Sequence, residues 1–211
     1  MKKFFLAFIL IFIVANNLLA EEVIKLPKPE ITGGMSLTEA LQLRRSTREF
    51  SGEILTSQEL SNLLWATAGV NRPDNNLRVY PVTMGIQDVF VFVFDSKGVY
   101  KYNALDHSLI LLKSGDHRAK TGIQEFVKSA SVNLAYVQDA SLWKIKNAPE
   151  NLIAQWGYAH IGALMQNAYL YAASQGWNAV VRGSFERDEL KKFLELPEDQ
   201  DIKLIHSIGK N

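Results

Sequence analysis

The segment Leu43-Arg-Arg-Ser-Thr-Arg-Glu-Phe50 gathers three arginines and two hydroxyl side chains within five residues. Guanidinium groups match phosphate oxygens two at a time, and serine and threonine hydroxyls supply further donors. In a chain whose formal net charge is only +1, a cluster this compact predicts a site for one small anion. The alternative is a solvated helix end, where the helix dipole favours cations.

Helix signals lie on both sides of this cluster. Ser36-Leu-Thr-Glu39 is a capping box, and it predicts a helix over residues 37–43 that ends at the arginines. Thr56-Ser-Gln-Glu59 is a second capping box, which predicts another helix that Gly69 ends. The arginine cluster is therefore expected in the connection between two helices.

The rest of the chain interleaves strands and helices. Apolar and β-branched runs predict strands over residues 89–94, 99–102, 109–112, 132–137, 179–181 and 202–208. Further helices are predicted over residues 117–129, 151–175 and 186–194. The helix over residues 151–175 should be buried on most sides, and Gly176 should end it. Ser184 should cap the helix over residues 186–194. Residues 70–79 are polar and predict a loop. Because hairpins also occur, the pattern predicts an α+β fold with an antiparallel or mixed sheet.

The N-terminus has the anatomy of a secretory signal. Residues 1–20 begin with two lysines, continue with an apolar run too short to span a bilayer, and end at Ala20. They predict Sec-type export to the periplasm or the medium, with membrane contact only through this segment. An uncleaved membrane anchor is the alternative. Residues 21–34 are predicted to be an extended arm, and residues 35–211 one domain.

Composition excludes several classes of function. Without residues 1–20 the chain holds 21 basic and 22 acidic residues, so nothing in its charge favours nucleic acid. It has no cysteine for a disulfide or a thiol nucleophile. Its four histidines lack metal-ligand spacing, and no serine stands in a G-x-S-x-G turn. Neither a metal site nor a serine hydrolase is expected.

Residues 43–50 resemble the N-terminal signature of the FMN-dependent nitroreductase superfamily. The resemblance continues through residues 64–74, 98–102, 121–124, 157–176 and 180–194, and it covers most of residues 36–209. It is closest to the bacterial branch near the SagB-like oxidases of peptides and azolines. It implies a nitroreductase-like α+β fold, with a mixed or antiparallel sheet flanked by helices. It also implies an intertwined homodimer with two FMN sites at its interface.

The same resemblance assigns roles to the arginine cluster. It implies that Arg44 and Ser46 contact the FMN phosphate and that Arg45 lies on the ribityl side. Arg48 falls at the pyrimidine edge of the flavin, where a cation would stabilise the negative charge of the reduced ring.

Further cofactor contacts are implied at Gln124, Gly183 and Ser184. Gln124 takes the place of a polar side chain that touches the flavin. Gly183 and Ser184 match a turn whose backbone approaches the reactive ring nitrogen, and a glycine permits that approach.

A third segment is expected to reach across to the partner's flavin. Relatives carry Pro-Ser-(Ser/Ala)-x-Asn-x-Gln there, and this chain reads Pro81-Val-Thr-Met-Gly-Ile-Gln87. Pro81 is kept, and Val82 and Thr83 could make the family's backbone contacts. Gly85 cannot replace the asparagine donor. Lys210 is the candidate for the basic residue that relatives place over the phosphate.

The resemblance implies an FMN-dependent oxidoreductase that acts by ping-pong chemistry on a small organic substrate at the dimer interface. The cofactor carries the chemistry, so no catalytic side chain is nominated. An exported enzyme would use an electron donor other than NAD(P)H. The alternative is an exported protein of the same fold that binds flavin or another phosphorylated ligand without redox turnover.

Three further side chains invite hypotheses. Trp143 lies in a loop-like stretch and is a candidate for a lid that faces the substrate, with core packing as the alternative. Arg72 and Arg78 flank the predicted loop over residues 70–79. They could help to hold an anionic ligand, although solvated loop arginines are the more common case.

Overall fold

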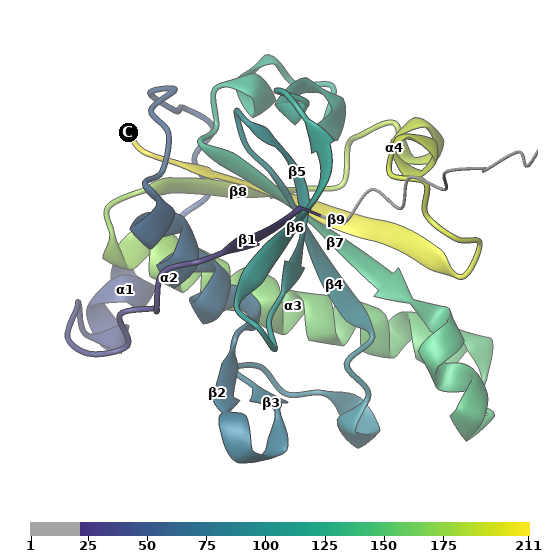
Figure 1. Cartoon of the computed structure of the whole chain (residues 1–211). Helices are drawn as coiled ribbons and strands as arrows, with labels where there is room; N and C mark the ends of the chain where they lie inside the picture. The colour runs from purple at the N-terminus through teal and green to yellow at the C-terminus, as the bar shows by residue number, and fades with distance from the viewer. Residues whose placement is uncertain (1–21) are drawn as a thin grey trace, which may run out of the picture.

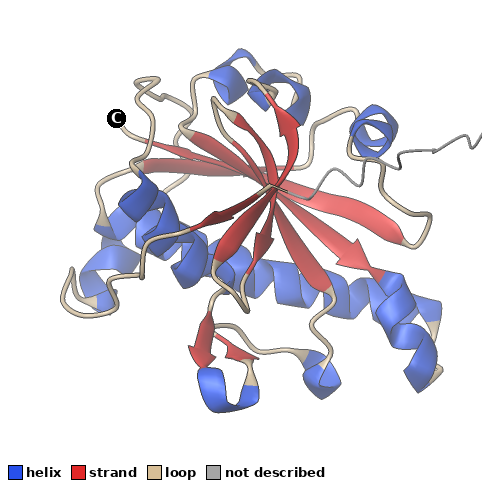
Figure 2. Ribbon diagram, in the orientation of Figure 1, coloured by secondary structure: helices blue, strands red, loops and turns tan. Residues whose placement is uncertain are grey.

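A seven-stranded antiparallel sheet forms the centre of the molecule (Figures 1 and 2). The computed structural model describes residues 22–211, apart from the side chain of Ile145. The predicted signal segment therefore lies outside the described residues. The strands, in spatial order, are β1 (Val23–Lys25), β6 (Ser108–Ser114), β5 (Gly98–Asn103), β4 (Val89–Phe94), β7 (Val132–Asp139), β9 (Gln200–Gly209) and β8 (Asn178–Arg182).

Helices cover both faces of the sheet (Figure 1). On one face lie α1 (Leu37–Leu43), α2 (Ser57–Ala68) and α3 (Glu150–Ser174), and on the other lies α4 (Arg187–Phe193). The predicted α+β fold with an antiparallel sheet is confirmed. Among the helices of residues 22–211, none combines the length and the apolar character that crossing a bilayer requires.

The central strand β4 explains why one stretch of sequence is apolar without interruption. Successive side chains of a strand point to opposite faces. Val91 and Val93 join the core under α2 and α3, whereas Phe92 and Phe94 join the core under α4. A strand buried on both faces has no position for a polar residue, so the run reads as continuous rather than alternating.

The capping boxes form as the sequence predicts. The Ser36 hydroxyl accepts the backbone N–H of Glu39, and the Glu39 carboxylate accepts the N–H of Ser36. Thr56 and Glu59 make the same pair of contacts at the start of α2. The two boxes fix the starts of α1 and α2, and the second of them ends the connection that carries the arginine cluster.

The long helix differs from its prediction in one respect. Its buried residues face the sheet and are Gly157, His160, Ile161, Leu164, Ala168, Ala172 and Ala173. The opposite side is open, because Tyr158 is 49% exposed and a Cβ at Gly162 would meet no atom within 4 Å. The expectation of burial on most sides is therefore wrong for a single chain. Gly162 on this outer side has no neighbour within residues 22–211 that its Cβ would meet.

Residues 70–79 are not a simple loop. They form a hairpin of β2 (Val70–Arg72) and β3 (Leu77–Arg78), with a short 3-10 helix between the strands. The indole N–H of Trp65 donates to the carbonyl of Val70, and Val79 N–H donates to Gly69 O. These contacts tie the hairpin to the end of α2, and the short strands carry no alternation that would reveal them.

Three smaller boundaries also differ. The helix predicted over residues 117–129 is split into η3 (Arg118–Thr121) and η4 (Glu125–Lys128), because Gly122 is extended and packs tightly against the Arg182 side chain. The N-cap of α4 is Glu186, not Ser184. The N-terminal arm contributes β1, which pairs with β6 at the edge of the sheet.

Gly157 and Gly162 on α3 offer a matched pair of substitutions. A Cβ at Gly157 would lie 2.1 Å from the Gln138 amide carbon, and Gln138 is itself held by hydrogen bonds. We expect Gly157→Ala to lower the free energy of unfolding by about 2 kcal/mol through overpacking. Gly162→Ala should cost much less, because a Cβ there meets no atom of its own chain and alanine has the higher helix propensity. Urea unfolding of both variants checks this, and equal effects would contradict the packing argument.

Candidate functional site

The arginine cluster lies along the outer edge of the sheet. Arg44 is the C-cap of α1, and its N–H donates to Ala40 O. Thr47 N–H then donates to the carbonyl of Ala179 on β8, at 2.9 Å. Because β8 is the last strand of the sheet, this hydrogen bond holds the cluster against an otherwise open edge.

A cavity of about 330 Å³ opens beside the cluster. It lies between the cluster, the end of α3 and the start of β8, and its walls include Arg44, Arg45, Thr47, Tyr169, Asn178 and Asn211. This volume is at the lower end of the range of ligand pockets. The cavity places two of the guanidinium-bearing residues, Arg44 and Arg45, on one wall.

Tyr169, which sequence reasoning missed, organises the floor of this cavity. Its hydroxyl accepts the backbone N–H of Val181 at 2.8 Å and lies 3.0 Å from the hydroxyl of Ser46. If Tyr169 donates to Ser46, the hydroxyl hydrogen of Ser46 is left for a ligand. The Arg44 guanidinium lies 5.3 Å from the centre of the Tyr169 ring. No local pattern marks Tyr169, because it is one of many large residues on α3.

A buried histidine lies next to this tyrosine. The ring centres of His206 and Tyr169 are 4.4 Å apart. Burial, together with the charge of Arg182, lowers the pKa of His206 to about 3. The ring is therefore neutral at pH 7 and adds no charge beneath the arginines.

The positive charge of the cluster is not neutralised by the protein. Within residues 22–211, none of Arg44, Arg45 and Arg48 forms an ion pair. Three cations close together repel one another, and an anion between them relieves that repulsion. The donor set thus fits a phosphate group.

Gln124 lies close to the same side of the molecule. It is the N-cap of η4, and its Oε1 is buried without a hydrogen-bond partner in the described part of the chain. Phe126 of η4 packs against Phe50, with ring centres 6.0 Å apart, which joins this segment to the end of the arginine cluster. A buried acceptor without a donor is costly, and the imide N–H of a flavin ring is a donor of the right kind.

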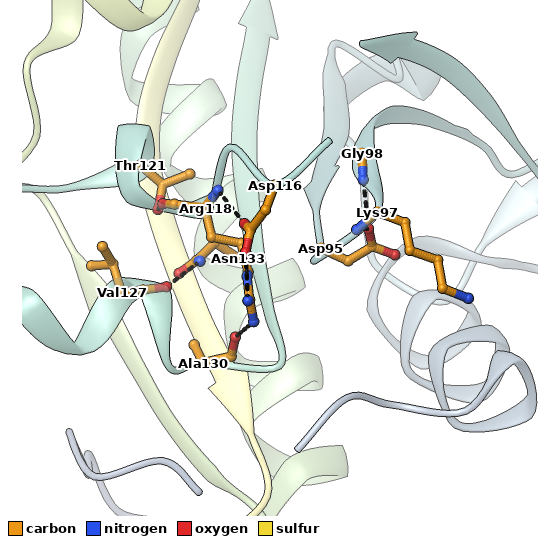
Figure 3. A network of polar contacts seen from close by, with 9 residues as sticks. All are labelled: Asp95, Lys97, Gly98, Asp116, Arg118, Thr121, Val127, Ala130 and Asn133. Carbon is orange, nitrogen blue, oxygen red and sulfur yellow. Dashed lines mark hydrogen bonds and ion pairs between the residues drawn. The ribbon is translucent and has the colours of Figure 1, made fainter. Parts of the chain in front are cut away.

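A polar network holds the segment that carries Gln124 (Figure 3). Arg118 donates to both carboxylate oxygens of Asp116 and to the carbonyl of Ala130. The hydrogen bonds from Arg118 lower the pKa of Asp116. Asn133 on β7 donates to the carbonyl of Val127. These contacts tie η4 to strand β7 and hold η3 against the residues that precede β7.

Gly183 and Ser184 follow the last residue of β8 and are both exposed. A Cβ at Gly183 would have only Leu204 within 4 Å, at 3.8 Å. The backbone at this turn is therefore open to a ligand. Thr47 bonds to Ala179 near the start of β8, and this turn lies just beyond the end of β8. The segment of Gln124 contacts the end of the arginine cluster through Phe126 and Phe50. All three parts therefore lie on the β8 side of the sheet.

Pro81, Val82 and Thr83 lie elsewhere. Thr83 begins the 3-10 helix η2 (Thr83–Gly85), and its N–H donates to His160 Nε2 at 2.8 Å. His160 precedes Tyr169 by nine residues on α3, which corresponds to about 13 Å along the helix axis. The structure does not bring this segment to the arginine cluster of the same chain.

A buried hydrogen-bond network fixes His160. Asp88 accepts hydrogen bonds from His160 Nδ1 at 2.6 Å, and from Trp143 Nε1 and Gln138 Nε2 at 2.8 Å each. The hypothesis that Trp143 is an exposed lid is wrong, because its side chain is fully buried and stacks on Trp156. The composition of residues 141–149 is typical of a loop. The indole of Trp143 is nevertheless buried, because its N–H donates to the buried carboxylate of Asp88.

The network also sets the tautomer of His160. Because Nε2 accepts the N–H of Thr83, the ring carries its proton on Nδ1 and donates it to Asp88. The Thr83 hydroxyl lies 3.1 Å from the same Nε2, so the backbone N–H and the hydroxyl of Thr83 share one acceptor. Among the residues that the structure describes, no cluster of three or more potential ligands could hold a metal ion.

Lys210 does not face the cavity. Its ammonium group pairs with Glu59 at 3.1 Å and with Glu53 at 3.9 Å. The neighbouring Asn211 lines the cavity instead and donates to Gly176 O.

Comparisons with known proteins agree with this architecture. The profile of the nitroreductase family matches residues 41–210. A crystal structure described as a nitroreductase from Ralstonia eutropha JMP134 is 40% identical, covers 90% of each chain and superposes with a TM-score of 0.84. A protein of Methanocaldococcus jannaschii named as a nitroreductase is 27% identical over 174 residues, which are 78% of this chain and 86% of that protein.

A more distant structure shares the fold alone. The NADPH:FMN oxidoreductase of Vibrio harveyi, solved in complex with NAD+, is 19% identical with a TM-score of 0.61, covering 82% of this chain and 68% of that one. The family profile spans most of the chain, and the Ralstonia eutropha structure is similar over nearly all of it. The chain belongs to the nitroreductase family of flavin-dependent oxidoreductases.

Proposed function

We propose that this protein is an FMN-dependent oxidoreductase that acts on a small organic substrate by ping-pong chemistry in a homodimer. The observation that carries the proposal is a cluster of three arginines without ion pairs in residues 22–211, two of which, Arg44 and Arg45, line a cavity at the β8 edge. The bound FMN would supply two-electron transfer at its ring. The side chains of this chain bind and orient it.

Each group of the site has a separate task in this proposal. Arg44 and Ser46 hold the phosphate, and Arg45 lies along the ribityl chain. Arg48 is at the pyrimidine edge, where its charge favours the reduced flavin. The orphaned Gln124 Oε1 accepts a ring N–H. Gly183 and Ser184 present open backbone toward the reactive part of the ring.

Two features support a homodimer. The outer side of α3 is open, with Tyr158 exposed, and the exposed Leu37 and Leu41 of α1 are also apolar. The segment of Pro81 and Val82 lies away from the arginine cluster of its own chain, so only a second chain could bring it to that cavity. The N–H of Thr83 is already bonded to His160, so a contact across the interface would use other atoms of this segment.

The signal-like residues 1–20 support export before the cofactor is acquired. We therefore propose an electron donor other than NAD(P)H, because these nucleotides are cytoplasmic. Efficient oxidation of NADPH by the purified protein would contradict this part of the proposal.

The proposal is tested with the chain that lacks residues 1–20. We expect it to retain about one FMN per chain after loading and desalting, and the flavin absorption should bleach with dithionite. Reoxidation by an added quinone or nitroaromatic compound shows turnover. Flavin that is retained but not reoxidised by any substrate favours the alternative, a flavin-binding protein without turnover. A colourless protein after loading contradicts both.

A further inference from the structure

A second cavity lies inside the sheet, where two neighbouring strands separate. β4 and β5 pair only from Phe92 and Lys101 to Phe94 and Val99. Residues 89–91 of β4 still pair with β7, and residues 102–103 of β5 still pair with β6. The two strands therefore diverge beyond these pairs, and a cavity of about 260 Å³ is lined by residues of both strands and of the β2–β3 hairpin.

One wall of this cavity is polar and cationic. Arg78 of β3 donates from Nε to Gln87 Oε1 at 2.7 Å, and its Nη1 is buried with no partner in the described chain. Arg78 forms no ion pair within residues 22–211. Burying a guanidinium without a carboxylate partner costs free energy, and a bound anion would offset that cost.

Two phenols stand beside this guanidinium on the cavity wall. Tyr80 and Tyr102 are both buried and line the cavity with Arg78. Burial raises the pKa of Tyr80 to about 12, and it raises the pKa of Tyr102 as well. Both hydroxyls are therefore protonated at pH 7. Tyr102 contacts His107 Nδ1, whereas the Tyr80 hydroxyl has no hydrogen-bond partner among residues 22–211 and can donate to an anion in the cavity.

The remaining walls are largely apolar. Phe90 forms a flat surface, and the ammonium group of Lys101 lies 4.0 Å from the centre of its ring on one side. Ala68, Leu105 and Ile110 complete the apolar lining. Arg78 is the one guanidinium of this lining, and the ammonium group of Lys101 is already placed over the Phe90 ring. A single carboxylate on an apolar body therefore matches the unpartnered charge of Arg78.

We propose that this cavity binds a small organic carboxylate with a flat apolar body. The carboxylate lies against Arg78 and the Tyr80 hydroxyl, and the body packs on Phe90. The site is separate from the cavity of the arginine cluster, because β7 and β9 stand between β4 and β8. At the usual strand spacing that separation is about 14 Å. The proposal does not depend on flavin binding.

Benzoate and its neutral isostere benzamide test the proposal by calorimetric titration of the flavin-free and FMN-loaded chain lacking residues 1–20. We expect benzoate to bind once per chain in both forms, and benzamide to bind at least tenfold more weakly. Arg78→Gln should weaken benzoate binding at least tenfold. The matched control is Lys97→Gln in the turn between β4 and β5, because Lys97 is exposed and outside the cavity; it should leave the affinity unchanged.

Several outcomes would overturn the assignment. Equal binding of benzoate and benzamide would show that Arg78 does not recognise charge. Loss of benzoate binding in Arg44→Ala, with Arg78→Gln unaffected, would move the ligand to the other cavity. If Arg78→Gln does not fold, Tyr80→Phe decides, because it removes one donor and keeps the ring. We expect that variant to bind benzoate at least threefold more weakly, and an unchanged affinity would reject the site.

Discussion

Replacing Arg44 and Arg48 together with alanine is expected to release the flavin. A hydrogen bond to a charged group contributes about 1.5–3 kcal/mol. Losing two such contacts should raise the FMN dissociation constant at least about a hundredfold. Neither arginine forms an ion pair within the described residues. The thermal stability of the flavin-free protein should therefore change little, apart from the contact of Arg44 with the Tyr169 ring.

Quenching of FMN fluorescence during titration measures the dissociation constant. The matched control is Arg72→Ala/Lys97→Ala, which removes the same charge at two exposed positions away from the cavity. We expect it to bind FMN as the unmodified chain does. Flavin retention by the Arg44→Ala/Arg48→Ala protein would remove the arginine cluster from the cofactor site. Ser46→Ala should have a smaller effect, about tenfold, because it removes one neutral donor.

The parts of the fold that sequence predicted are those whose signals are local. A capping box needs only residues three apart, so the starts of α1 and α2 could be predicted from Ser36 and Thr56. The strand β4 is marked by six consecutive apolar residues. The β2–β3 hairpin was not predicted, because its strands are only two and three residues long and are held by the hydrogen bonds of Trp65 to Val70 and of Val79 to Gly69.

The candidate site divides in the same way. The arginine cluster is contiguous, so its composition alone indicated an anion site. Tyr169 could not be found, because it comes to lie beside Ser46 only through the fold, 123 residues further along the chain. Sequence also could not separate Arg72 from Arg78. The hairpin does so, since it leaves Arg72 exposed and buries part of Arg78 against a cavity.

Asp88 shows most clearly what only the fold reveals. Its partners His160, Trp143 and Gln138 lie 50 to 72 residues away in sequence. Burial by itself would raise the pKa of Asp88, but the hydrogen bonds from these three donors outweigh it and lower the pKa below 3.8. The three donors therefore hold the charged form of Asp88 more strongly than the protonated form, and these hydrogen bonds stabilise the folded protein.

Asp88→Asn is expected to lower the free energy of unfolding by about 3 kcal/mol. An asparagine oxygen could still accept from Trp143 and Gln138, but its amide would then face His160 Nδ1. The histidine could respond only by moving its proton to Nε2, where it would meet the N–H of Thr83. One buried donor is therefore left unpaired whichever tautomer forms. Thermal and urea unfolding at fixed protein concentration measure the loss, and Asp74→Asn, at an exposed position, is the matched control.

The pH dependence of stability separates this explanation from a general packing defect. Because the pKa of Asp88 is lower in the folded protein than its ordinary value of 3.8, its stabilisation is complete above that value. The stabilisation is lost as the pH falls from 3.8 through the pKa of the folded state. The difference in stability between the unmodified chain and Asp88→Asn should therefore be largest near neutral pH and shrink on acidification. A difference that stays constant down to pH 3 would mean that the charge of Asp88 is not what holds His160 and Trp143.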